Sequence, residues 1–65
     1  MNKEQLKIFK RQTRGFIQWV NKEEGIDVRE DCRKITFAKT SEEVQAVLSL
    51  HDDGSFLQMV AAGCF

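Results

Sequence analysis

Apolar and polar positions over the first third of the chain repeat with the period of an α-helix. One stripe, spaced in steps of three and four residues, consists of Leu6, Phe9, Thr13, Phe16 and Val20. On a helix this spacing makes a face about 100° wide. Asn2 and Gln5 have the types and spacing of a capping box, and Gly25 suits the left-handed residue that comes after a last turn. The sequence therefore predicts a helix from Lys3 to Glu24.

A second pattern, with a period of two, begins after residue 32. Residues 33–38 place Ile35 and Phe37 on one side of an extended chain, which is typical of a half-buried strand. Residues 44–50 and 56–62 are two further runs that are compatible with strands.

The polar segment between these two runs suits a tight turn. Asp52, Asp53 and Gly54 fit a three-residue hairpin loop in which the glycine takes the left-handed conformation. With this loop, and a four-residue loop at residues 40–43, all three runs turn their apolar sides the same way. The sequence thus predicts an α+β fold, in which the N-terminal amphipathic helix packs on a three-stranded antiparallel β-meander (α-β-β-β).

Residues 41–51 admit a second interpretation, because Thr40 and Glu43 have the types and spacing of a capping box. A helix would then run through Leu50 in place of the second strand. The agreement between turn type and side-chain alternation favours the hairpin.

The predicted sheet turns one apolar face to the helix and the other to solvent. The solvent face carries Val47, Leu57 and Met59, and three apolar residues together indicate an interface. The helix is also longer than the strands, about 33 Å against about 23 Å, so its N-terminal half with Leu6 and Phe9 overhangs the sheet. Both features predict a homodimer with the helix in the interface.

Net charge is zero but unevenly distributed. Residues 1–22 carry six basic residues against one acid, a net +5, and residues 23–65 carry four against nine, a net −5. The basic side chains form a second stripe on the helix, made of Lys3, Lys7, Lys10, Arg11 and Arg14. This stripe suits an acidic partner protein or, as the alternative, nucleic-acid phosphates. Neutralisation of the two halves within the fold explains the same pattern equally well.

The sequence carries no pattern typical of a catalytic, metal or cofactor site. His51 is the only histidine, and together with Cys32 and Cys64 it lacks the spacing of a zinc site. In the predicted meander the two cysteines lie at opposite ends of the sheet, so no disulfide is expected. We therefore expect neither an enzyme nor a bound cofactor.

The length of 65 residues corresponds to a single small domain, residues 1–65. The chain shows no secretory leader pattern and no long apolar run, which predicts a cytoplasmic protein without membrane contact. We expect a small intracellular protein-binding regulator or inhibitor that acts by surface contact as a homodimer. The alternative is a nucleic-acid-binding protein that uses the basic face of the helix.

Overall fold

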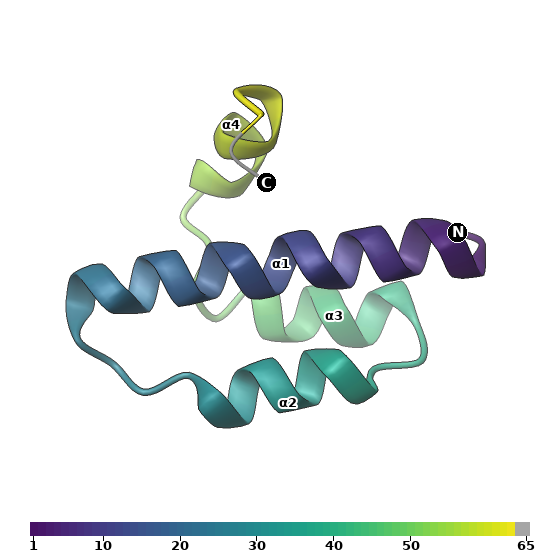
Figure 1. The fold of residues 1–65 in the computed structure, drawn as a ribbon, viewed down its shortest axis with the longest axis horizontal. Coiled ribbons are helices and arrows are strands. Elements are labelled where there is room, and N and C mark those ends of the chain that lie inside the picture. Colours follow the sequence, from purple (N-terminus) through teal and green to yellow (C-terminus); the bar gives the residue numbers. More distant parts are fainter. Residues whose placement is uncertain (64–65) are drawn as a thin grey trace.

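The structure, a computed structural model, describes residues 1–63 and is built from helices throughout that range (Figure 1). The helices are α1 (Lys3–Glu24), α2 (Arg29–Phe37), α3 (Ser41–Leu48) and α4 (Ser55–Ala61). No strand occurs among the described residues. The predicted α+β fold with a three-stranded meander is therefore wrong, and the protein is a small all-helical one.

Helix α1 has the ends that the sequence predicts. The Gln5 amide donates to the Asn2 side-chain oxygen at 2.8 Å, and the Asn2 amide donates to Gln5 Oε1 at 3.1 Å, which completes the capping box. At the other end Gly25 has φ 74° and its amide donates to the carbonyl of Asn21 at 2.6 Å. Only glycine takes this left-handed conformation without steric cost, so the helix ends there.

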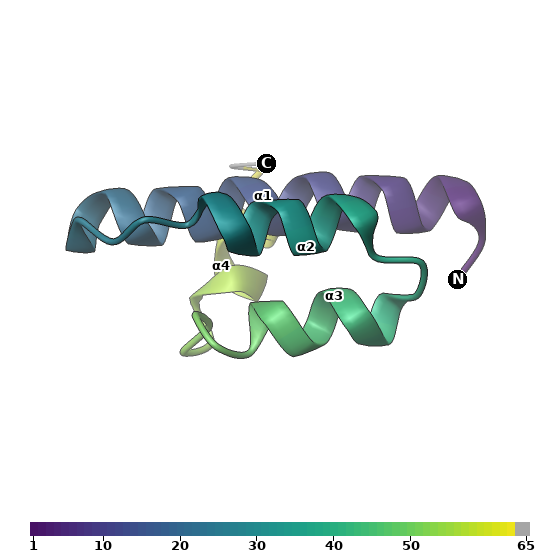
Figure 2. The same ribbon diagram turned by 90° about the horizontal axis from the view of Figure 1, so that it is seen from below.

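Helices α1, α2 and α3 run alternately up and down, joined by short loops. Both α2 and α3 lie on one side of α1, and both ends of α1 extend past them (Figures 1 and 2). Helix α4 crosses α1 on the side away from α2 (Figure 1). Helix α1 contacts each of the other three helices, so it organises the whole described chain.

Helix α2 replaces the first predicted strand. Ile35 is fully buried, whereas Phe37 is 73% exposed, although an extended chain would place both on one side. Residues two apart on a helix lie about 200° apart round its axis, so one faces the core and the other faces solvent. The alternation between these residues reflected opposite sides of a helix rather than one face of a strand.

Helix α3 confirms the helical alternative for the segment that begins at residue 41, although it ends at Leu48 and not at Leu50. The hydroxyl of Thr40 accepts the Glu43 amide at 3.3 Å, while the Glu43 carboxylate accepts the Lys39 amide at 2.7 Å. Val44, Val47 and Leu48 are buried, with the steps of three and one that a helix face requires. Val47 therefore belongs to the core and not to a solvent-facing sheet interface, which was a wrong prediction.

The predicted hairpin loop begins helix α4 instead. Gly54 does have a positive φ, 103°, but the chain continues into a helix. The Asp52 carboxylate accepts the amides of Gly54 at 2.8 Å and Phe56 at 3.3 Å, and the Asp53 carboxylate accepts the Ser55 amide at 3.2 Å. Carboxylates at this end satisfy amides that have no partner within the helix and complement its dipole.

The core lies between α1 and the three shorter helices. Its buried apolar residues are Phe16, Ile17, Ile35, Ala38, Val44, Val47, Leu48 and Phe56. Leu6 and Phe9 are half-buried and pack against this core, and the Phe9 ring meets Phe56 edge-on at 6.3 Å. The expected bare overhang of Phe9 is wrong because α4, which takes the place of a strand, covers it.

Candidate partner-binding surface on α1

The basic face of α1 comprises Lys3, Lys7, Lys10, Arg11 and Arg14, and two of these cations hold helix α2. The Lys10 ammonium donates to the carbonyl of Ala38 at 2.8 Å, just past the end of α2. The Arg14 guanidinium donates to the Thr36 hydroxyl at 3.1 Å. The C-terminal carbonyls of a helix carry partial negative charge, so cations are favourable there. Lys10 and Arg14 therefore stabilise the fold as well as contributing charge.

A groove runs along the basic face between α1 and the end of α2. Its volume is about 360 Å³, and it is lined by Lys3, Leu6, Lys7, Lys10, Arg14 and Thr36. Four of these side chains are cationic, one is apolar and none is acidic. The groove has the chemistry to receive carboxylates along its rim and a small apolar group against Leu6.

The exposed cations of this face are not neutralised by acids of the chain. Lys3, Lys7 and Arg11 are exposed, and the acid–base contacts among residues 1–63 are Arg29 with Asp27 and His51 with Asp31. Both contacts lie outside α1, within the acidic part of the chain. Neutralisation of the basic helix by ion pairs within the fold therefore does not occur in the described residues.

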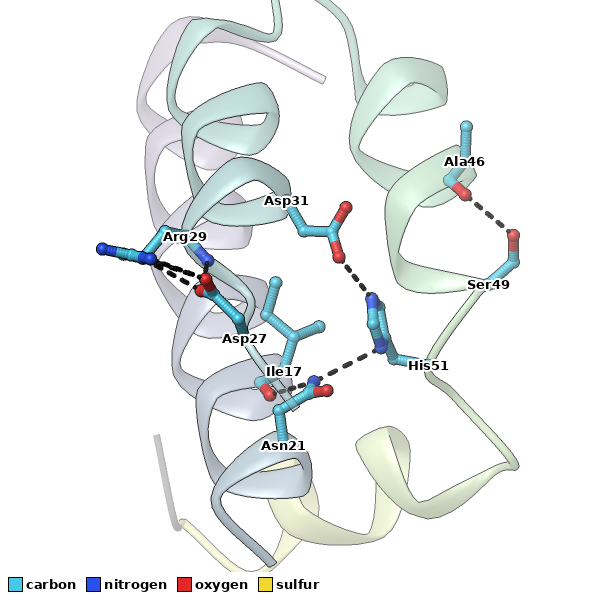
Figure 3. A network of polar contacts seen from close by, with 8 residues as sticks. All are labelled: Ile17, Asn21, Asp27, Arg29, Asp31, Ala46, Ser49 and His51. Atoms are coloured by element: carbon cyan, nitrogen blue, oxygen red, sulfur yellow. Dashed lines mark hydrogen bonds and ion pairs between the residues drawn. The ribbon is translucent and has the colours of Figure 1, made fainter. Parts of the chain in front are cut away.

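The contact between Asp27 and Arg29 fixes the start of α2. The Arg29 guanidinium donates to the Asp27 carboxylate at 2.8 Å, and the Arg29 backbone amide donates to it at 3.0 Å (Figure 3). Hydrogen bonds from the Arg29 guanidinium, and to a smaller extent from the Arg29 backbone amide, lower the pKa of the Asp27 carboxyl from 3.8 to about 2. This carboxylate caps a helix that lacks a side-chain cap at Val28.

A polar network joins α1, α2 and the segment after α3 (Figure 3). The buried Asn21 amide nitrogen donates to the carbonyl of Ile17 at 2.7 Å and lies 3.3 Å from Nδ1 of His51. His51 Nε2 lies 2.9 Å from the Asp31 carboxylate. Because the Asn21 nitrogen only donates, His51 Nδ1 is the acceptor, and His51 Nε2–H donates a hydrogen bond to the Asp31 carboxylate.

This network connects α1, α2 and the segment after α3 through hydrogen bonds. It ends at the Ile17 backbone carbonyl and contains no hydroxyl or thiol that His51 would activate. The contact between His51 and Asn21 was not predicted from the sequence. The one available signal was that Asn21 lies one turn after Ile17, on the core side of α1. Among residues 1–63, no three His, Cys, Asp or Glu side chains gather as a metal ion requires.

The residues expected to form an interface do not share one surface. Leu57 is 73% exposed on α4, Met59 is half-buried against the core, and Val47 is buried. Leu6 and Phe9 also pack against the core. The exposed large apolar residues are instead Met1, Ile8, Trp19, Ile26, Phe37, Leu50 and Leu57.

Cys32 is a free thiol on α2, half-buried beside the core. Burial raises the pKa of its thiol, which lowers the fraction of reactive thiolate at neutral pH. The expected absence of a bond between Cys32 and Cys64 depends on Cys64, which lies outside the described residues.

Comparison with protein-family models, with curated proteins and with solved structures gave no match to this chain. Within the described residues, no helix combines the length and the apolar character needed to cross a bilayer. Function is therefore inferred from the surface of the molecule itself.

Proposed function

We propose that this protein is a small regulator or inhibitor that binds an acidic surface of another protein through the basic face of α1. The proposal includes the cytoplasmic location expected from the sequence. The observation that carries it is the exposure of Lys3, Lys7 and Arg11 without an acid in contact among residues 1–63. Such a face attracts an acidic partner and orients it during approach.

The groove beside these cations supports a peptide-like partner. Leu6 lies between the cationic side chains, so a bound segment would place an apolar side chain on Leu6 and carboxylates on Lys3 and Lys7. Apolar contact supplies affinity that is insensitive to salt, whereas the rim charges supply rate and specificity. This combination favours a protein over a purely polyanionic partner.

Nucleic-acid binding is the alternative function, and the surroundings of the basic face argue against it. Next to the groove, a hollow of about 240 Å³ shares Leu6 and includes one cation, Lys39, and one acid, Glu42. Helix α3, which comes after the turn at the end of α2, begins with Glu42 and Glu43 in its first turn. A duplex that extended past α1 would bring its phosphates against these acids, and the like charges would repel. A compact acidic patch on a protein can contact the basic face without reaching them.

The test uses a triple variant of the full chain, Lys3→Glu with Lys7→Glu and Arg11→Glu. Lys10 and Arg14 stay unchanged because they hold α2. The matched control reverses three exposed basic residues away from the groove, Lys22→Glu with Arg33→Glu and Lys34→Glu, and so changes the net charge equally. Circular dichroism establishes that both variants remain helical.

Each protein is immobilised and exposed to nuclease-treated lysate of the source cells. We expect acidic proteins to be retained by the unmodified chain and by the control, and to be lost by the triple variant. If the control variant lost the acidic proteins to the same extent, net charge alone would explain the result, which would contradict the proposal.

A second measurement separates the two functions. The affinity for labelled duplex and single-stranded oligonucleotides is measured over a series of salt concentrations. Tight oligonucleotide binding that falls steeply with salt, together with no retained protein, would establish the nucleic-acid alternative.

A further inference from the structure

A third face of α1 exposes two large apolar side chains, and the residues between them, Gln12 and Gly15, are half-buried. It consists of Gln5, Ile8, Gln12, Gly15 and Trp19, spaced in steps of three and four residues, and we name it the outer seam. Its centre lies about a third of a turn round the helix from the core positions. Ile8 is 42% exposed and Trp19 is 46% exposed, so the seam presents two large apolar side chains to water.

The two ends of the outer seam differ in shape. A shallow hollow of about 540 Å³ surrounds Ile8 and is lined by Met1, Gln5, Ile8, Phe9 and Gln12. Trp19 stands about three helical turns away on the same face and is the only tryptophan of the chain. One face of one helix therefore carries both an apolar depression and a large apolar side chain.

We propose that α1 pairs with α1 of a second copy of this chain in an antiparallel, twofold arrangement in which each Trp19 fills the hollow around Ile8 of the other copy. When the twofold axis passes between residues 13 and 14, Ile8 lies opposite Trp19 and Gln12 lies opposite Gly15. The steps of four, three and four residues along the seam are those of a coiled-coil contact. Gly15, without a side chain, lets the two helices approach closely at the centre.

The charges beside the outer seam fit the same register. Glu4 and Lys22 lie on the same edge of the seam, and the axis that pairs Ile8 with Trp19 brings Glu4 within one residue of the position opposite Lys22. The symmetry produces this pair twice. A parallel pairing would instead place Glu4 beside Glu4 and Lys22 beside Lys22, which is repulsive.

Most of the basic face that binds the proposed partner lies away from the outer seam, although Arg11 shares a hollow with Ile8 at the edge of the seam. Lys3, Lys7 and Lys10 lie on the opposite flank of α1, towards α2, and stay open in the dimer. The outer seam therefore supplies an interface for the homodimer expected from the sequence. The seam of Leu6, Phe9 and Phe16 that the sequence suggested is not available, because these residues pack within one chain.

Sedimentation equilibrium of the full chain over a range of concentrations measures the dimer, and the emission of Trp19 measures its environment. We expect a single monomer–dimer equilibrium, with emission moving to shorter wavelength as the dimer forms. Replacement of Trp19 with alanine should raise the dimer Kd at least about tenfold, since tryptophans centred in an interface carry much of its affinity. The matched control Phe37→Ala removes an exposed aromatic ring from α2 and should leave the Kd unchanged.

A charge exchange tests the antiparallel register. Either Glu4→Lys or Lys22→Glu alone places like charges opposite each other twice, which should raise the Kd about threefold to tenfold at low salt. The double variant restores the attraction and should return the Kd to that of the unmodified chain.

Three results would overturn the inference. The first is a monomer at about 100 µM, a concentration that populates even a weak dimer. The second is a dimer Kd that Trp19→Ala leaves unchanged. The third is a double variant of Glu4 and Lys22 whose Kd does not return to that of the unmodified chain. Each leaves the proposed function standing if acidic proteins are still retained through Lys3, Lys7 and Arg11. Conversely, a dimer without acidic partners would support the outer seam and contradict the proposed function.

Discussion

The ring of Phe56 on α4 meets the ring of Phe16 on α1 edge-on, with centroids 5.3 Å apart and planes at 75°. Phe56 is the one buried residue of α4, and its ring also meets Phe9. Edge-to-face pairs add to the free energy of simple burial. Phe56 is therefore the central contact of α4 with the core, and the half-buried Met59 and Val60 add to it.

Replacing Phe56 with alanine should lower the free energy of unfolding by about 3–5 kcal/mol, as loss of a buried phenylalanine usually does. Urea denaturation measures this loss, and NMR chemical shifts report whether residues 55–61 remain helical. The neighbouring Leu57→Ala removes a side chain that is 73% exposed and should change stability little. Equal effects of the two substitutions would contradict the packing of α4.

Gly54 should resist substitution because of its backbone conformation. With φ at 103°, a β-branched residue such as valine is strained, and Gly54→Val should cost more than about 1 kcal/mol. No heavy atom lies within 4 Å of the position a Cβ would take, so the cost is conformational and not a clash. Gly54→Asn should be milder, since asparagine tolerates positive φ. Thermal denaturation compares the two, and an equal or larger loss in the asparagine variant would refute this explanation.

Removal of His51 should break the hydrogen bonds that join Asn21 and Asp31 to it. His51→Ala is expected to destabilise by about 1–3 kcal/mol, because the Asn21 amide and the Asp31 carboxylate each lose a part-buried hydrogen bond. A double-mutant cycle with Asp31→Ala should be non-additive, since one bond serves both residues. Ser49→Ala, which removes an exposed hydrogen bond to Ala46, is the control. Additive losses would show that His51 and Asp31 do not interact.

Acid should weaken the start of α2 through Asp27. Its folded pKa, about 2, lies below the ordinary 3.8, so the unfolded chain binds the proton more readily. The contribution of Asp27 to stability is therefore complete above pH 3.8 and is lost as pH falls towards about 2. The difference in urea midpoint between the unmodified chain and Asp27→Asn should shrink across this window. A difference independent of pH would disprove the role of the ionised carboxylate.

The sequence predicted α1 in full because three independent signals agreed there. The apolar period, the Asn2–Gln5 capping box and Gly25 all describe one helix, and its interior needs no distant partner to be recognised. The basic face could be predicted directly from the spacing of the cations along this helix. The hydrogen bonds from this face to Ala38 and Thr36 could not be predicted, since they depend on where α2 ends in space.

The rest of the fold was missed because short apolar runs fit two periods at once. In α3 the buried positions are Val44, Val47 and Leu48, and in α4 Phe56 packs with Met59 and Val60 in the same spacing. This helical spacing was present in the sequence, but alternation and a turn-forming Asp-Asp-Gly favoured strands. The two aspartates do mark a turn of the chain, but their carboxylates accept the first amides of a helix, so α4 stands where a strand was predicted.

The attachment of α4 around Phe56, its one buried residue, also sets how the molecule fluctuates. Ile35 and Val44 are fully buried in the core outside α4. A segment that opens without disturbing them exchanges its amide hydrogens with an opening free energy lower than that of global unfolding. Residues 55–61 form such a unit, whereas the amides in the middle of α1 report the whole core. Each opening of α4 would remove Phe56 from both Phe9 and Phe16, so one local event would expose both of these α1 rings to water.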